Sequence, residues 1–124
     1  MRLSKTLSFM AFMLAATVVS AQDSAKVSPG VNTVLVENAH VRVVKSTFKP
    51  GMKEGTHTHP AGWYIVTHGG DLKVTAADGK VSHWLAKDGE QAWMEAEAPH
   101  TAENVGKGVF EYILVEVKGA AHAK

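Results

Sequence analysis

The sequence predicts an all-β domain, either a sandwich or a barrel. Short runs of alternating apolar and polar residues recur between Val31 and Val117. Turn signals separate these runs, and the Asp78-Gly79 pair among them is typical of a β-hairpin. A helical period of about 3.6 residues is not sustained in any segment. We therefore expect about eight strands and no long helix.

The expected strands follow one another along the chain, each bounded by a turn. Two strands precede the turn at Lys49-Pro50-Gly51, and a Gly-rich stretch then leads into a strand that carries His57 and His59. Alternation and apolar runs predict the strands at 34–36, 41–46, 63–67, 72–76, 81–85, 91–94, 101–105 and 109–117.

The first 21 residues resemble a secretory signal peptide. Arg2 and Lys5 precede an apolar run from 7 to 19, and Val19-Ser20-Ala21 supplies small residues at a cleavage site. The run is shorter than the about 20 apolar residues that a spanning helix needs, although an uncleaved anchor is the alternative. We therefore expect export, to the periplasm of a bacterium or beyond. The predicted organisation is a signal peptide at 1–21, a flexible lead-in at 22–30, one domain at 31–118 and a tail at 119–124.

Composition excludes several kinds of partner and chemistry. Removing 21 of the 124 residues leaves 103, a usual size for one domain. Arg2 and Lys5 account for two of the 13 basic residues, which leaves 11 against 12 acidic residues and a formal charge of −1. This balance offers no basic patch for nucleic acid or for a membrane surface after signal cleavage. The chain has no cysteine, so disulfides and thiol chemistry are excluded.

Three histidines predict a metal site. His57 and His59 are two residues apart on an expected strand, so their side chains point to the same face. His100 is the third, in a segment that also holds Asn104. Three convergent imidazoles are typical ligands of a divalent transition metal.

These residues give the chain a resemblance to the cupin superfamily. Gly51, His57, His59 and Gly70 match the first cupin motif, and the second motif is matched by Gly89, His100 and Asn104. The resemblance implies a double-stranded β-helix jelly roll, the cupin barrel, with a metal at the bottom of a lumen that is open at one end. The implied cofactor is one divalent transition metal ion (Fe, Mn, Zn, Ni or Cu) bound by His57, His59 and His100.

Two departures from the cupin pattern bear on the ligand set. The glutamate of the first motif falls at Trp63, which cannot bind a metal, and Glu95-Ala96-Glu97 replaces the proline and glycine of the second motif. Three neutral imidazoles would leave the charge of the ion uncompensated, unless Glu95 or Glu97 swings in as a carboxylate ligand. We expect Trp63 to line the pocket beside the metal, where it would floor the site, stack a flat ligand or block it.

The remaining histidines are interpreted from their places in the expected strands. His83 alternates with Val81 and Leu85 and is expected to line the pocket, together with Trp63, Glu95 and Glu97. His68 falls in a turn, nine residues beyond His59, which is too far along the strand for ligation. His40 reads as a turn residue and His122 as part of a solvated tail.

Two classes of function are compatible with the predicted fold and metal site. The first is a metalloenzyme, a dioxygenase or isomerase, that acts on a small molecule at an open coordination position. The second is a non-catalytic periplasmic module that binds a small ligand or a metal ion. A structural dimer with a vestigial site is a weaker third reading, and apolar edge strands are compatible with a homodimer.

Overall fold

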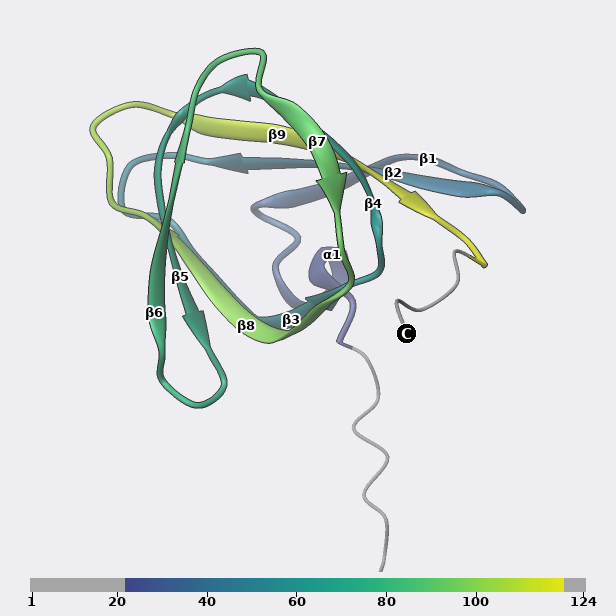
Figure 1. Ribbon diagram of the computed structural model, residues 1–124, viewed down its shortest axis with the longest axis horizontal. Coiled ribbons are helices and arrows are strands. Elements are labelled where there is room, and N and C mark those ends of the chain that lie inside the picture. The colour runs from purple at the N-terminus through teal and green to yellow at the C-terminus, as the bar shows by residue number, and fades with distance from the viewer. Residues whose placement is uncertain (1–21, 120–124) are drawn as a thin grey trace, which may run out of the picture.

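The protein is an antiparallel β-barrel built from two sheets, as the computed structural model shows for residues 22–119 (Figure 1). The first sheet has the order β1-β2-β9-β4-β7. Its strands are β1 (Asn32–Glu37), β2 (Val41–Phe48), β4 (Gly62–His68), β7 (Gln91–Met94) and β9 (Phe110–Val117). The second sheet has the order β3-β8-β5-β6. It consists of β3 (Lys53–His59), β5 (Gly70–Ala76), β6 (Val81–Ala86) and β8 (Glu97–Asn104).

The prediction of an all-β jelly roll is confirmed. The nine strands pair in antiparallel fashion, with β9 held between β2 and β4 and β8 held between β3 and β5. The Asp78-Gly79 turn joins β5 to β6, and Gly79 has a φ of 88°, which favours glycine. Among the described residues, no helix is long and apolar enough to cross a membrane.

The core lies between the two sheets and is closed by aromatic rings. Phe48, Phe110 and Leu114 are almost fully buried, because alternate residues of β2 and β9 face inward. Trp84 packs edge to face on Phe110, with the ring centroids 5.2 Å apart, and it meets Tyr112 at 5.3 Å. These contacts fix one wall of the interior.

The segment at 22–30, predicted to be a flexible lead-in, is instead fastened to the barrel. A short helix, α1 (Ser24–Val27), begins after Asp23, whose side chain accepts a hydrogen bond from the amide of Ala25. Asp23 also pairs with Arg42 at 2.7 Å, and the amide of Thr58 donates to the carbonyl of Gln22. This segment therefore supports the strand that carries His57 and His59. The predicted signal peptide and residues 120–124 of the tail, with His122, lie outside the described residues.

Close packing of β4 against β9 leads to a first prediction. A Cβ added at Gly62 would clash with the backbone carbonyl of Val115, and backbone cannot move aside cheaply. We expect Gly62→Ala to lower the free energy of unfolding by about 1–3 kcal/mol in chemical denaturation. Gly108→Ala is the control, because an added Cβ at Gly108 meets nothing within 4 Å. Equal stability of the two variants would contradict the packing of β4 on β9.

Candidate metal centre

Three histidine side chains meet inside the barrel. His57 and His59 come from β3, and His100 comes from the neighbouring β8, where it lies directly across from His57. One nitrogen from each of the three rings lies within 4.8 Å of the others. All three residues are buried, and His57 is completely so. The structure thus brings together the three residues that the sequence predicted as ligands.

Backbone carbonyls set the proton positions on two of these rings. Nδ1 of His57 lies 2.7 Å from the carbonyl oxygen of Gly55, and Nδ1 of His100 lies 2.8 Å from that of Ala98. A carbonyl can only accept, so each Nδ1 carries the proton and, in the neutral ring, Nε2 keeps its lone pair. Carbonyls orient metal-bound histidines in the same way.

The spacing of the imidazole nitrogens fits ligands of one ion. Nε2 of His57 lies 3.0 Å from Nε2 of His59. Two nitrogens bound at a right angle to one ion, with bonds of about 2.1 Å, are about 3.0 Å apart. Without an ion, one of the two nitrogens must carry a proton to avoid facing lone pairs. His59 differs from the other two rings, because its buried Nδ1 has no hydrogen-bond partner among residues 22–119 and no carbonyl sets its proton position.

Glu54 is the residue that the sequence analysis missed. Its carboxylate is buried, with Oε1 3.0 Å from Nε2 of His57. The contact is short but poorly aligned, so Oε1 has no hydrogen bond within the described part of the chain. Oε2 accepts from Nδ2 of Asn32 at 2.7 Å, and Asn32 in turn accepts from the hydroxyl of Ser46 at 2.6 Å. A buried hydrogen-bond chain therefore aims one carboxylate at the histidine cluster.

A second carboxylate approaches from the other strand. Oε2 of Glu97 lies 3.1 Å from Nε2 of His100, and its side chain is 40% exposed. Burial, reinforced by the charge of Glu54, raises the pKa of Glu97 against the opposing effect of His100 and His57. Glu97 therefore lies between the histidines and the solvent, whereas Glu95 lines only the outer cavity.

His57 and His59 differ in how readily they take up a proton. Burial, together with the charges of His57, His100 and Arg42, lowers the pKa of His59 to about 3. Burial also acts to lower the pKa of His57, but the close, negatively charged carboxylate of Glu54 outweighs it and raises that pKa above its usual value of 6.5. His59 is thus neutral and ready to ligate, whereas His57 holds a proton that a metal ion must displace.

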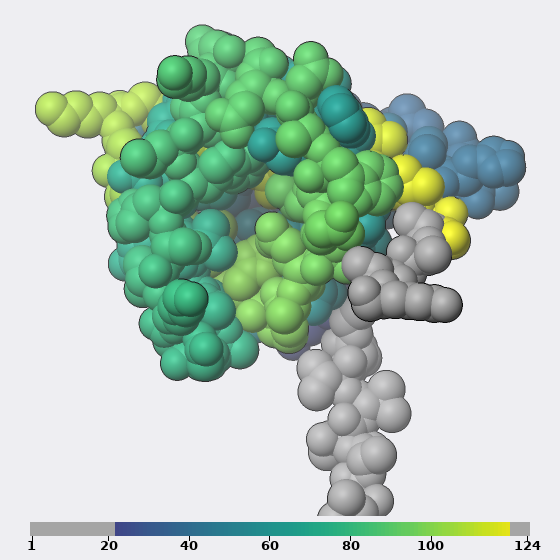
Figure 2. Space-filling view, viewed as in Figure 1, coloured from purple at the N-terminus to yellow at the C-terminus, as the bar shows by residue number. Residues whose placement is uncertain are grey.

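Two connected cavities lead from the surface to the cluster. The outer cavity holds about 400 Å³, and an inner cavity of about 30 Å³ is lined by His59, His100 and Glu54. Both are lined by Val74, Trp84, Met94 and Glu97, so the outer cavity opens onto the inner one. Figure 2 shows the hollow on this face, between β6 on one side and β7 with β8 on the other.

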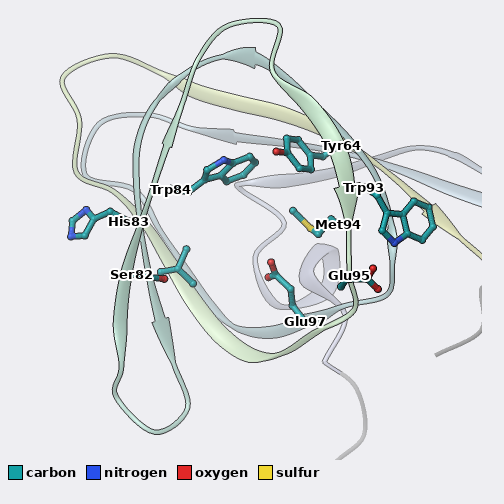
Figure 3. A pocket seen from close by; sticks show the side chains of 9 residues that line it. Tyr64, Ser82, His83, Trp84, Trp93, Met94, Glu95 and Glu97 are labelled. Carbon is teal, nitrogen blue, oxygen red and sulfur yellow. The ribbon is translucent and has the colours of Figure 1, made fainter. Parts of the chain in front are cut away.

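Three of the four predicted pocket residues line the outer cavity, and the fourth, Trp63, does not. Glu95, Glu97 and His83 line the outer cavity. The ring of His83 is turned away from it toward Asp71, whose Oδ1 lies 2.7 Å from Nδ1 (Figure 3). His68 lies at the end of β4, outside the group of three ligands.

The placement of Trp63 beside the metal is wrong. The indole is 42% exposed, donates to Oε1 of Gln91 at 3.2 Å and lines neither of the two connected cavities. Neighbouring residues of a strand point to opposite faces, so the inward position belongs to Tyr64, which lines the outer cavity. Trp63 therefore neither floors nor blocks the site.

Solved structures with the same architecture include cupin domains. The protein resembles a cupin domain from Bordetella pertussis Tohama I with a TM-score of 0.66 and 22% identity, over 72% of this chain and 93% of that one. A double-stranded β-helix protein from Klebsiella pneumoniae gives a TM-score of 0.57 and 27% identity, over 73% of this chain and 78% of that one. A cupin 2 conserved barrel domain protein from Leptotrichia buccalis gives 0.52 and 28%, over 71% of this chain and 40% of that one.

These matches show that the chain has the double-stranded β-helix fold of cupins, and they support its assignment to the cupin superfamily. Neither the protein-family models nor the curated proteins that were compared with the sequence give a match. Residues 22–119 form one small barrel of this fold, with three histidines positioned to bind a metal.

Proposed function

We propose that the protein binds one divalent transition metal ion (Fe, Mn, Zn, Ni or Cu) through His57, His59 and His100 and presents it to a small molecule in the pocket. The observation that carries this proposal is the convergence of three buried nitrogens, two of which are 3.0 Å apart. Carbonyl acceptors on Nδ1 of His57 and His100 leave Nε2 as the donor atom of each ring.

A metalloenzyme, of the dioxygenase or isomerase kind, is the form of this function that we favour. A bound ion with an open position would supply Lewis-acid or redox activation of a substrate. The chain contributes the pocket that orients the substrate and a carboxylate, Glu97, on the path to the histidines. The raised pKa of Glu97, caused by burial, brings it nearer to neutral pH, as a group that accepts and returns a proton requires.

The carboxylates also favour the second function, a non-catalytic module. Glu54 and Glu97 lie 3.0 and 3.1 Å from the Nε2 atoms of His57 and His100, so protons can hold the cluster together without an ion. Such a cluster would bind a small ligand, or release and take up metal, without turnover. Metal affinity as a function of pH tests whether an ion replaces these protons.

We expect the affinity for zinc or manganese to rise with pH between about 6 and 8. The raised pKa of His57, caused by Glu54, means that the metal-free protein holds this proton below the unfolded value of 6.5 and loses it only as pH rises through the raised value. The ion competes with that proton, so binding weakens as pH falls. Calorimetric titration at several pH values is the measurement. An affinity that does not change over this range would contradict ligation by His57.

We also propose that the protein is exported and acts in the periplasm or outside the cell. The support is the basic start, the apolar run and the Val19-Ser20-Ala21 site. We expect the intact mass of the protein from its native host to match a chain that begins at Gln22. A soluble species that retains Met1 would contradict export by this route.

A further inference from the structure

We propose that the pocket takes a small aromatic molecule without negative charge, preferably one with a protonated amine that pairs with Glu97. The proposal rests on the proposed function in one respect, because it concerns the cavity that leads to the three histidines. It specifies which chemistry the cavity selects, and it does so from the charge, the aromatic surface and the dimensions of the lining.

The sizes of the two cavities determine which part of a ligand each can hold. The outer cavity of about 400 Å³ has room for a single ring with a short side chain, whereas the inner cavity of about 30 Å³ has room for one water-sized group. The ring of a ligand must therefore remain in the outer cavity, and only a small polar group can extend past Glu97 toward His59 and His100.

The charges of the lining disfavour an anion. The two cavities are lined by three carboxylates, those of Glu54, Glu95 and Glu97, and neither lining includes a lysine or an arginine. Carboxylate and phosphate ligands are usually held by such side chains. Arg42 lines a separate cavity and is paired there with Asp23 and Glu116. A cation, in contrast, can pair with these carboxylates in both the outer and the inner cavity.

The aromatic surface favours a flat ring. Tyr64 and Trp84 stand nearly perpendicular, with centroids 5.0 Å apart, and their polar atoms both donate to Oε1 of Glu90 at 3.0 and 3.2 Å. Their hydrogen-bonding groups are thus satisfied, and apolar ring surface is left for the cavity. Figure 3 shows Met94 in the same interior and Glu97 pointing into it, while Trp93 is turned outward. Thioethers and indoles both pack well on aromatic rings.

An aromatic amine satisfies all three features. Its ring packs on Trp84 and Tyr64, and its ammonium gains the carboxylate of Glu97 together with the aromatic faces. The affinity for the amine depends on the charge of Glu97, whereas the affinity for a neutral ring depends only on the aromatic wall. One substitution at Glu97 can therefore separate the two contributions.

The test compares three probes that differ only in the terminal group: phenethylamine, 2-phenylethanol and 3-phenylpropionate. Binding is measured by calorimetry on metal-free protein, so that the carboxylate of 3-phenylpropionate cannot gain affinity by ligating an ion. We expect the amine to bind at least about tenfold more tightly than the carboxylate, with the alcohol between them. Equal or tighter binding of 3-phenylpropionate would overturn the proposal.

Glu97→Gln should lower the affinity for phenethylamine about tenfold and leave that for 2-phenylethanol within about twofold. Glu103→Gln is the matched control, because Glu103 lies on the same strand but lines neither of the two cavities. Unchanged amine affinity in Glu97→Gln would also overturn the proposal. Zinc binding is measured on the same samples. In the wild-type protein, absence of amine selectivity with zinc binding retained contradicts this inference alone, whereas amine selectivity without zinc binding contradicts the proposed metal site alone.

Discussion

His59→Ala is expected to lower the affinity for a divalent metal ion by more than about a hundredfold. Loss of a residue that merely orients a ligand typically costs 10–100-fold, so loss of a ligand should cost more. His59 is the most direct choice among the three, because its pKa is lowered to about 3 and its Nε2 lies 3.0 Å from Nε2 of His57. His57→Ala and His100→Ala should have similar effects.

The control for this series is His68→Ala. His68 lies at the end of β4, outside the group of three ligands, so the affinity for the ion should remain within about twofold of wild type. His122→Ala should also leave the affinity unchanged. Competition titration against a chromogenic chelator measures the affinity of all five variants. An affinity of His59→Ala equal to that of wild type would remove His59 from the ligand set.

Phe110→Ala is expected to lower the free energy of unfolding by about 3–5 kcal/mol, which is more than the loss expected for Gly62→Ala. Phe110 is completely buried, and its ring packs on Trp84 and Tyr112 with centroids 5.2 and 6.3 Å apart. Its loss leaves a cavity behind the wall of the pocket, which the surrounding strands cannot fill. For a domain of this size, the melting temperature should fall by at least about 12 °C.

Leu85→Ala provides the comparison for Phe110→Ala. Leu85 is 71% exposed on β6, so its truncation should change the free energy of unfolding by less than about 0.5 kcal/mol. Chemical denaturation of both variants in the metal-free state excludes a contribution from bound metal. Similar losses at the two positions would show that the core is not centred on Phe110.

The strands and the histidine ligands could be predicted because the relevant signals are local. Alternation along a strand places His57 and His59 on one face, and the turn at Asp78-Gly79 fixes the β5–β6 hairpin. The pairing of His57 with His100 depends on how β3 meets β8, and the resemblance to cupins supplied that contact before the structure did.

Glu54 could not be predicted because β3 is irregular between Glu54 and His57. An odd separation along a regular strand puts two side chains on opposite faces, so a carboxylate three residues before His57 should point away from it. The β3–β8 register shifts between Glu54 and His57, and this irregularity brings both side chains to the interior. A bulge of this kind leaves no clear signal in a single sequence.

The prediction assigned the inward position to Trp63 instead of to Tyr64, the next residue. An error of one residue along a strand moves a side chain to the opposite face of the sheet. The spacing of the first cupin motif allows the glutamate position to fall on Trp63 or on Tyr64, and only the pairing of β4 with β9 and β7 shows which of the two faces inward. The docking of the segment at 22–30 was missed for a different reason. It depends on the long-range Asp23–Arg42 pair and on a backbone bond to Thr58, which polar composition does not reveal.

Metal content tests most directly whether the three histidines hold one metal ion. The protein is purified without an affinity tag, and the metal bound per chain is counted by mass spectrometry of the elements, in wild type and in His57→Ala. We predict about one divalent transition metal ion per chain in wild type and almost none in His57→Ala. Equal metal content in the two proteins, or a wild type that stays free of metal after incubation with excess zinc and manganese at pH 8, would contradict ligation of a metal ion by the three histidines.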